Sequence, residues 1–108
     1  MKRYAVELTD TALGAIHAQL RFIAIEQRQP PNAERWLAMV WDAVDSLETF
    51  PHGRPLATEN EDVPYEVRFV LAGHESLLFT IEEDQQLVRI IAMRGQGQLP
   101  ISDDLPPL

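Results

Sequence analysis

The 108-residue sequence contains no cysteine, which excludes disulfides, zinc–thiolate sites and a cysteine nucleophile. Basic residues are scarce, because nine stand against 17 acidic ones and leave a formal net charge of -8. The excess is largest in the second half, where residues 51–108 hold four basic and ten acidic side chains. Negative charge repels phosphate backbones, so we do not expect direct nucleic-acid binding.

Long apolar runs are also missing. The first ten residues lack the apolar segment of a signal peptide, and no run approaches the ~18 residues that a membrane span requires. We therefore expect a cytoplasmic protein without membrane contact. The length favours one domain over residues 1–98 and a Pro-rich acidic C-terminal tail over residues 99–108. We expect this tail to be disordered or draped over a partner.

Two helices are predicted in the first half of the chain. Thr9 and Asp10 offer N-cap oxygens to the first, which should end near Gln29 because Pro30 and Pro31 remove two backbone donors. The second should follow a cap at residue 32 and end at residue 51. Their short connection predicts an antiparallel hairpin. The apolar stripes comprise Leu13, Ile16, Leu20 and Ile23 in the first helix, and Leu37, Val40, Trp41, Val44 and Leu47 in the second.

Alternating apolar residues predict strands at residues 4–8, 65–71, 77–81 and 87–93. The order β-α-α-β-β-β defines an α+β fold, in which the two-helix hairpin packs on one face of an antiparallel sheet. The predicted core comprises Leu13, Ile16, Leu20, Val40, Trp41, Val44, Leu47, Val67, Phe69, Leu77, Phe79, Ile81 and Ile90.

The two tryptophans should point in different directions. Trp36 and Trp41 lie about 140° apart around the second helix, so only one of them can face the sheet. We assign Trp41 to the core. Trp36 is then either partly covered by the first helix or part of an interaction surface. The histidines do not have the spacing of metal ligands, and neither a metal nor a cofactor is expected.

Four strings occur in an order that resembles a known family. They are the opening Tyr-x-Val-x-Leu-Thr-Asp-x-Ala, the string AERW at residues 33–36, SLETFPHGRP at residues 46–55 and VRFVLAG at residues 67–73. Together they resemble the RelE/ParE superfamily, the growth-inhibiting toxins of type II toxin–antitoxin systems, over residues 4–95. The resemblance implies a small cognate antitoxin whose C-terminal segment wraps the helices and adds a strand or helix to the surface of this chain, so that the two form a hetero-oligomer.

Departures from the family pattern bear on the mechanism. Where the family usually places two tyrosines and two arginines, residues 74–81 read HESLLFTI. Arg94 aligns with the arginine of a terminal V-R-H string, but Gly95 stands where the histidine would be. The RNases of the family need cationic groups to stabilise the phosphorane and an acid to protonate the leaving oxygen. The chain therefore looks closer to ParE, which implies a non-enzymatic toxin that binds a target such as DNA gyrase.

Two alternatives stay open. One is a ribosome-dependent mRNA endonuclease of the RelE type with Arg68, Arg94 and His74 as candidate catalytic residues. The other is a degenerate, non-toxic member that keeps antitoxin binding. For the antitoxin contact we expect mainly apolar affinity and weak salt dependence, with the partner-binding residues Arg21, Arg28, Arg35 and Trp36. The target-binding candidates are Arg54, Arg68 and Arg94, although Arg54 and Arg68 could instead pair with nearby acids.

Overall fold

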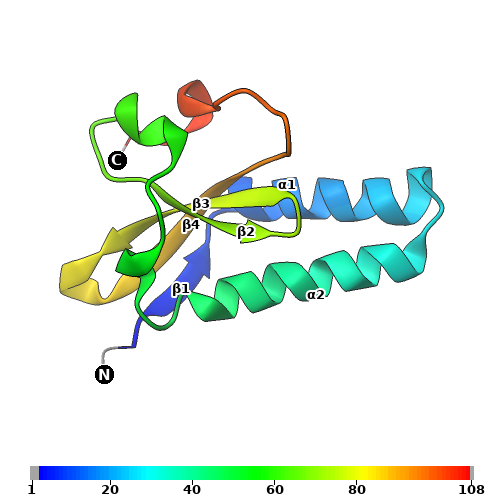
Figure 1. Cartoon of the computed structure of the whole chain (residues 1–108), viewed down its shortest axis with the longest axis horizontal. Coiled ribbons are helices and arrows are strands. Elements are labelled where there is room, and N and C mark those ends of the chain that lie inside the picture. Colours follow the sequence, from blue (N-terminus) through cyan, green and yellow to red (C-terminus); the bar gives the residue numbers. More distant parts are fainter. Residues whose placement is uncertain (1–2, 108) are drawn as a thin grey trace.

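The computed structural model describes residues 3–107 and has the predicted α+β class (Figure 1). Its helices and strands are β1 (Ala5–Leu8), α1 (Asp10–Arg21), α2 (Pro30–Ser46), β2 (Arg68–Ala72), β3 (Glu75–Glu82) and β4 (Leu87–Arg94). Short 3-10 turns lie between α2 and β2, between β3 and β4 and near the C-terminus. Within the described range, no helix has the length and apolar character needed to cross a bilayer.

The four strands form one mixed sheet in the order β1-β4-β3-β2. The pairs β2–β3 and β3–β4 are antiparallel, as expected. The first strand differs from the prediction, because β1 runs parallel to β4 with Val6 opposite Val88. Alternation of apolar residues reports which face of a strand is buried but carries no information about the direction of its neighbour.

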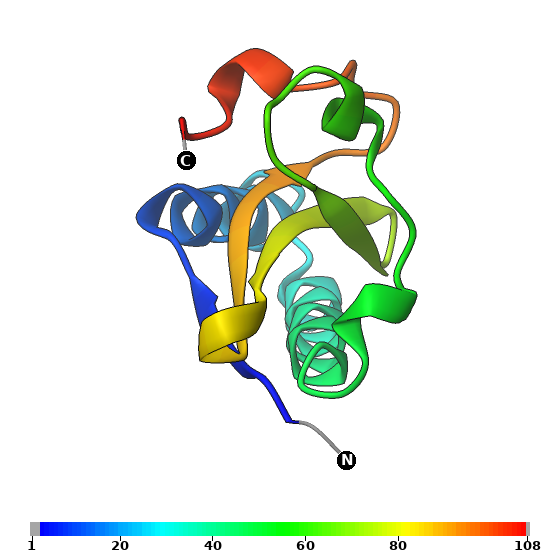
Figure 2. The same cartoon turned by 90° about the vertical axis from the view of Figure 1, so that its left-hand side faces the viewer.

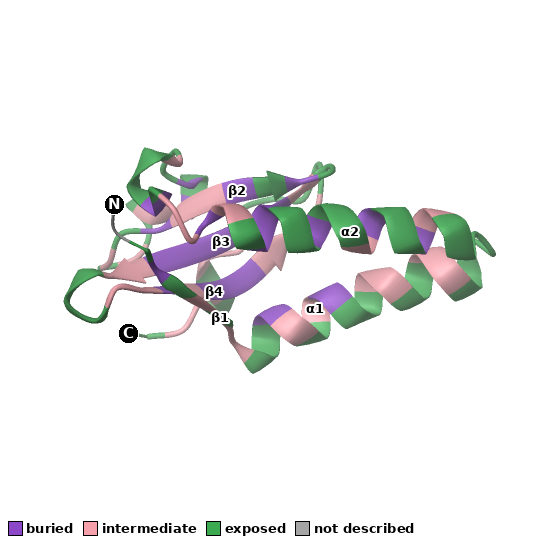
Figure 3. Cartoon of the chain, turned by 90° about the horizontal axis from the view of Figure 1, so that it is seen from below, coloured by how far each residue is buried: buried purple, intermediate pink, exposed green. Residues whose placement is uncertain are grey.

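Both helices cover the same face of the sheet, with α1 against β4 and α2 against β2. The helical hairpin is longer than the sheet, so its closed end projects beyond the β2–β3 turn (Figures 1 and 3). This main core buries most of the predicted residues. Ile16, Val40, Val44, Leu47, Leu77, Phe79 and Ile90 are buried in it, and Leu20 and Ile81 are partly buried against it.

The link between the helices differs in detail from the prediction. After Arg21 the chain continues through a π-helical turn, Phe22–Glu26, before it leaves the helix. The second helix begins at Pro30 rather than after Asn32, with its two prolines in the first turn. Proline is tolerated there because the first N–H groups of a helix have no partner within the helix.

A second core lies on the sheet face away from the helices. Val67, Leu78, Ile91 and Ala92 are buried there, and Ile91 and Ala92 are adjacent because a bulge shifts the β3–β4 register at Leu78/Phe79. The segment 99–107 covers this face, contrary to the expectation of a disordered or partner-bound tail. Its residues Ile101 and Leu105 pack on the cluster. Figure 2 shows this red segment beside the green loop that precedes β2.

An ion pair between Glu59 and Arg94 helps to hold the C-terminal segment on this face of the sheet. Glu59, which is fully buried, accepts a hydrogen bond from Arg94 Nε at 2.8 Å and another from the Ile101 N–H at 3.1 Å through the same carboxylate oxygen, Oε2. The other oxygen, Oε1, is buried without a hydrogen bond among the described residues. Glu59 therefore joins the loop before β2, the end of β4 and the C-terminal segment.

Tyr65 gives this region an alkaline sensitivity. Its hydroxyl donates to the Pro106 carbonyl at 2.6 Å, and partial burial raises the pKa of Tyr65 above its ordinary value. An unfolded tyrosine titrates near pH ~10. The contribution of the neutral hydroxyl to stability is therefore present below about pH 10 and is lost as the pH rises through the higher folded pKa.

We expect denaturant titrations between about pH 8 and 11.5 to show a steeper alkaline loss of stability for the native chain than for Tyr65→Phe. The two curves should converge as the tyrosine hydroxyl ionises. Parallel curves across the whole range would contradict this assignment.

Candidate partner-binding surface

The projecting end of the helical hairpin is the candidate partner-binding surface. We call the segment from Ala18 to Arg35 the hairpin tip. Its closed end projects beyond the sheet (Figure 3), although Leu20 and Ile23 within it still pack against the main core. Phe22 is 42% exposed and Ile25 is 64% exposed.

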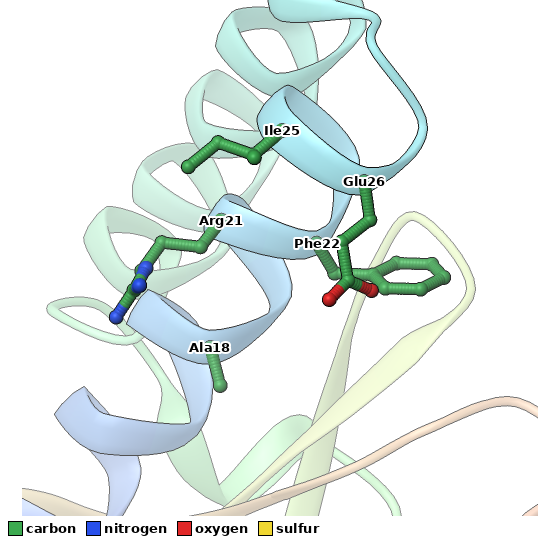
Figure 4. Close-up of a pocket in the computed structure, with 5 residues that line it drawn as sticks. All are labelled: Ala18, Arg21, Phe22, Ile25 and Glu26. Carbon is green, nitrogen blue, oxygen red and sulfur yellow. The ribbon is translucent and has the colours of Figure 1, made fainter.

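A shallow depression marks one side of the hairpin tip. It has a volume of about 320 Å³ and is lined by Ala18, Arg21, Phe22, Ile25 and Glu26. Figure 4 shows Arg21 and Ile25 extending to one side, with Phe22 and Glu26 on the other. The depression therefore combines an aromatic ring, an aliphatic side chain and a guanidinium group.

Three of the four predicted partner-binding residues lie on the hairpin tip. Arg21 ends α1, Arg28 lies in the link with a φ of 54°, and Arg35 lies in α2, where it donates to the Asn32 side chain. Within residues 3–107, none of the three forms an ion pair with a carboxylate. Residues 18–35 hold these three arginines and the two acids Glu26 and Glu34, so their net charge is positive on a chain of charge -8.

The fourth residue, Trp36, is not exposed, and the assignment of the two tryptophans was wrong. Trp36 is 5% exposed and its Nε1 donates to Glu75 Oε1 at 2.6 Å, whereas Trp41 is 42% exposed. The stripe of α2 is centred between Trp36, Val40 and Leu47, so Trp41 falls outside it. An apolar helix position at the edge of a stripe does not reveal which side the sheet covers.

The three predicted target-binding arginines occupy different environments. Arg94 pairs with Glu59 on the second face of the sheet. Arg68 bonds to Glu66 Oε1 at 2.9 Å and to the Arg54 carbonyl at 2.6 Å. Arg54 donates to Ser46 Oγ at 3.0 Å and, within the described chain, forms no ion pair with a carboxylate. The structure does not bring the three guanidinium groups to one site.

Two of the candidate catalytic residues are therefore engaged in structural contacts. The side chains of Arg68 and Arg94 are mostly covered, with exposures of 19% and 18%. The remaining candidate, His74, lies exposed in the β2–β3 turn. Within residues 3–107, no three His, Asp or Glu side chains lie close enough to hold a metal ion.

A cluster of three titratable side chains was not foreseen. Tyr4 donates to Glu83 at 3.0 Å, and His52 Nε2 lies 2.7 Å from Glu83 Oε2. The three residues come from segments far apart in the sequence, so no local pattern could have shown the contact. Because the side chains of His52 and Glu83 are 42% and 44% exposed, we interpret the cluster as a surface tie between the start of β1 and two turns.

Comparison with known proteins relates the fold to one structural class. No protein-family model matches the sequence, and no curated protein matches it. Solved structures do match. One is a chain of the toxin–antitoxin complex RelBE2 from Mycobacterium tuberculosis, with a TM-score of 0.58 and 23% sequence identity over 91% of this chain and 97% of that chain. The chain therefore has the fold of a subunit of a toxin–antitoxin complex.

Proposed function

We propose that the chain is the toxin-type subunit of a type II toxin–antitoxin pair in the RelE/ParE superfamily. The observation that carries the proposal is the fold shared with a chain of the RelBE2 complex over nearly the whole of both chains. The family-like strings in the sequence support it independently, because they are read from side chains and not from the backbone. The partner is a small antitoxin, and the two chains form a hetero-oligomer.

The hairpin tip is the proposed antitoxin contact. Exposed Phe22 and Ile25 supply apolar area, which is the main source of affinity in most interfaces. Arg21 lines the same depression, and Arg28 and Arg35 lie elsewhere in the hairpin tip. These cations select a partner segment that carries acidic side chains. Trp36 does not contact the antitoxin in this model. Its hydrogen bond to Glu75 holds α2 on the sheet that supports the hairpin.

This model makes a prediction about the antitoxin complex. Replacing Phe22 and Ile25 together with Ser should weaken binding by about 100-fold or more, because two apolar contacts are lost. The matched control is Leu99→Ser, which changes an 81% exposed apolar side chain in the C-terminal segment, outside the hairpin tip. The measurement is a calorimetric titration with the cognate antitoxin.

The same titration is repeated at low and high ionic strength to measure how the affinity depends on salt. Because exposed ion pairs are weak and screened, affinity should fall less than about tenfold between low and high ionic strength. Two outcomes would contradict this contact: an unchanged affinity in the Phe22/Ile25 variant, or a steep loss of affinity with salt. Either would mean that the apolar side chains of the hairpin tip do not supply most of the affinity.

We further propose a ParE-like mode of action, in which the toxin binds its target and makes or breaks no bond. The engaged guanidinium groups of Arg68 and Arg94 support this choice, as do the Thr, Ser and Phe side chains at the positions where the family has arginines and tyrosines. DNA gyrase is the target that the resemblance to ParE suggests, and a supercoiling assay with purified gyrase tests it.

Expression of the chain alone tests toxicity directly. A toxin should arrest growth, and co-expression of the cognate antitoxin should restore it. Growth without arrest, combined with tight antitoxin binding, would identify a degenerate member that retains only the partner contact. If the chain neither arrests growth nor binds the antitoxin, the proposal as a whole is overturned.

A further inference from the structure

Phe50 combines an exposed aromatic ring with a strained backbone conformation. It lies in the turn that follows α2 and has a φ of 51° and a ψ of 54°, in the left-handed region that residues with a Cβ disfavour. It also precedes Pro51, and a residue before proline normally adopts an extended conformation. The side chain is 75% exposed. Glycine would adopt this backbone at lower cost, so folding alone does not explain the aromatic ring.

The turn around Phe50 holds the ring in one position. Pro51 is fully buried and begins a short 3-10 turn, in which the Gly53 N–H donates to the Phe50 carbonyl at 3.1 Å. The ring lies against Gly53, where an added Cβ would be only 2.6 Å from Phe50 Cε2. A larger residue at position 53 would displace the ring. One edge of the ring is therefore supported by the turn, while most of its surface faces solvent.

A recess of about 340 Å³ adjoins the ring. It is lined by Ser46, Thr49, Phe50, Gly53 and Arg54. Among these lining residues, Arg54 alone carries a charge. Asp42 lines the neighbouring hollow between α2 and β2 but does not line this recess. The charge beside the ring is therefore positive.

Arg54 has hydrogen-bonding capacity left for a partner. Its Nη2 donates to the Ser46 hydroxyl at 3.0 Å, and its carbonyl accepts a hydrogen bond from Arg68 Nη1 at 2.6 Å. Within residues 3–107, its guanidinium group forms no ion pair with a carboxylate. A guanidinium group has five N–H donors, so Arg54 can still bind a carboxylate in a bidentate arrangement.

The surface formed by Phe50 and Arg54 is separate from the hairpin tip. Helix α2 begins in the tip at Pro30 and ends at Ser46, so the two surfaces lie at opposite ends of a helix roughly 25 Å long (Figure 1). A partner that contacts only the hairpin tip leaves Phe50 exposed. The chain therefore presents a second apolar and cationic surface that the antitoxin contact does not use.

We propose that Phe50 and Arg54 form the contact with the protein that the toxin targets. The ring inserts into an apolar pocket of this folded target, and Arg54 binds a carboxylate at the rim of the pocket. Aromatic and arginine side chains supply much of the affinity of many interfaces, and a ring that is already held in place loses little entropy on binding. The proposal rests on the proposed toxin function and assigns the target contact that this function requires.

The experiment compares full-length variants in three measurements: growth at controlled expression levels, urea unfolding, and calorimetric titration with the cognate antitoxin. Phe50→Gly should need at least about tenfold more expressed protein to arrest growth, because the aromatic contact is lost. Its urea midpoint should be unchanged or higher, because glycine adopts the left-handed backbone without strain. Its antitoxin affinity should stay within about twofold, because the hairpin tip is distant and intact.

Two substitutions serve as controls for the loss of the ring. Gln86 has a φ of 49° in the β3–β4 turn, so Gln86→Gly relieves the same backbone conformation and keeps Phe50. Phe50→Tyr keeps an aromatic ring. Both variants should arrest growth as the native chain does. Arg54→Gln should weaken the arrest by about tenfold or more, because a bidentate charged contact is lost.

The three measurements separate this proposal from the toxin function on which it rests. If the native chain and Phe50→Gly arrest growth at the same expression level, the target contact lies elsewhere and the toxin function stands. A lower urea midpoint in Phe50→Gly would show that the ring serves folding, which also overturns the proposal. If the native chain does not arrest growth, the toxin function fails and the target contact fails with it.

Discussion

Replacing Trp36 with Ala should lower the free energy of unfolding by about 3 to 5 kcal/mol. The side chain is 5% exposed and fills the space between α2 and the β2–β3 turn, where Gly73 allows the turn to approach. Its removal leaves a cavity and also strips Glu75 of the indole N–H donor. Equilibrium urea titration followed by far-UV circular dichroism measures the loss.

Trp41→Ala is the matched control on the same helix. Trp41 is 42% exposed, so its truncation should change stability by less than about 1 kcal/mol. Trp36→Phe separates the two contributions at the buried site, since it keeps most of the volume and loses only the hydrogen bond. A larger loss at Trp41 than at Trp36 would mean that α2 presents its opposite face to the sheet.

Arg94→Ala should have an effect of similar size, about 3 to 5 kcal/mol, for a different reason. The substitution leaves Glu59 fully buried without its cationic partner. An unpaired buried carboxylate is far more costly than the loss of the pair as a whole. Thermal or urea unfolding of the single variant measures this effect.

A second substitution identifies the cause. Glu59→Gln keeps an acceptor for the Ile101 N–H and removes the charge. The double variant Arg94→Ala/Glu59→Gln should therefore regain a large part of the stability that Arg94→Ala loses. If the double variant is no more stable than Arg94→Ala, the buried charge is not the reason for the loss. Limited proteolysis near residue 101 should follow the same order, because the C-terminal segment depends on Glu59.

The local periodicity was enough to predict the elements and most of the main core. The 3.6-residue stripes and the two-residue alternation are set by local geometry, so the helix hairpin and strands are found close to their predicted places. The edge of the α2 stripe was ambiguous. Trp36 and Trp41 both border it, and only the position of the β2–β3 turn decides between them.

Contacts between distant segments could not be predicted in this way. The parallel pairing of β1 with β4, the Glu59–Arg94 pair and the packing of Ile101 each join residues far apart in the sequence. Of the candidate site residues, Arg21, Arg28 and Arg35 lie together on the hairpin tip, because helix connectivity was predicted correctly. The exposed Phe22 and Ile25 were missed. Both are apolar residues that lie outside the apolar stripe of the first helix. Their position off the stripe could have indicated that they are exposed.

The central claim is that this chain acts by binding and not by cutting RNA. Toeprinting of ribosomes translating a defined mRNA, with the purified full-length chain added at increasing concentration, tests it most directly. An established ribosome-dependent RNase toxin serves as the positive control, and Arg68→Gln and Arg94→Lys are assayed after each is shown to be folded. We predict no cleavage at the A-site codon by the native chain. Cleavage there by the native chain that is lost in either folded variant would contradict the claim and establish the RelE-type mechanism instead.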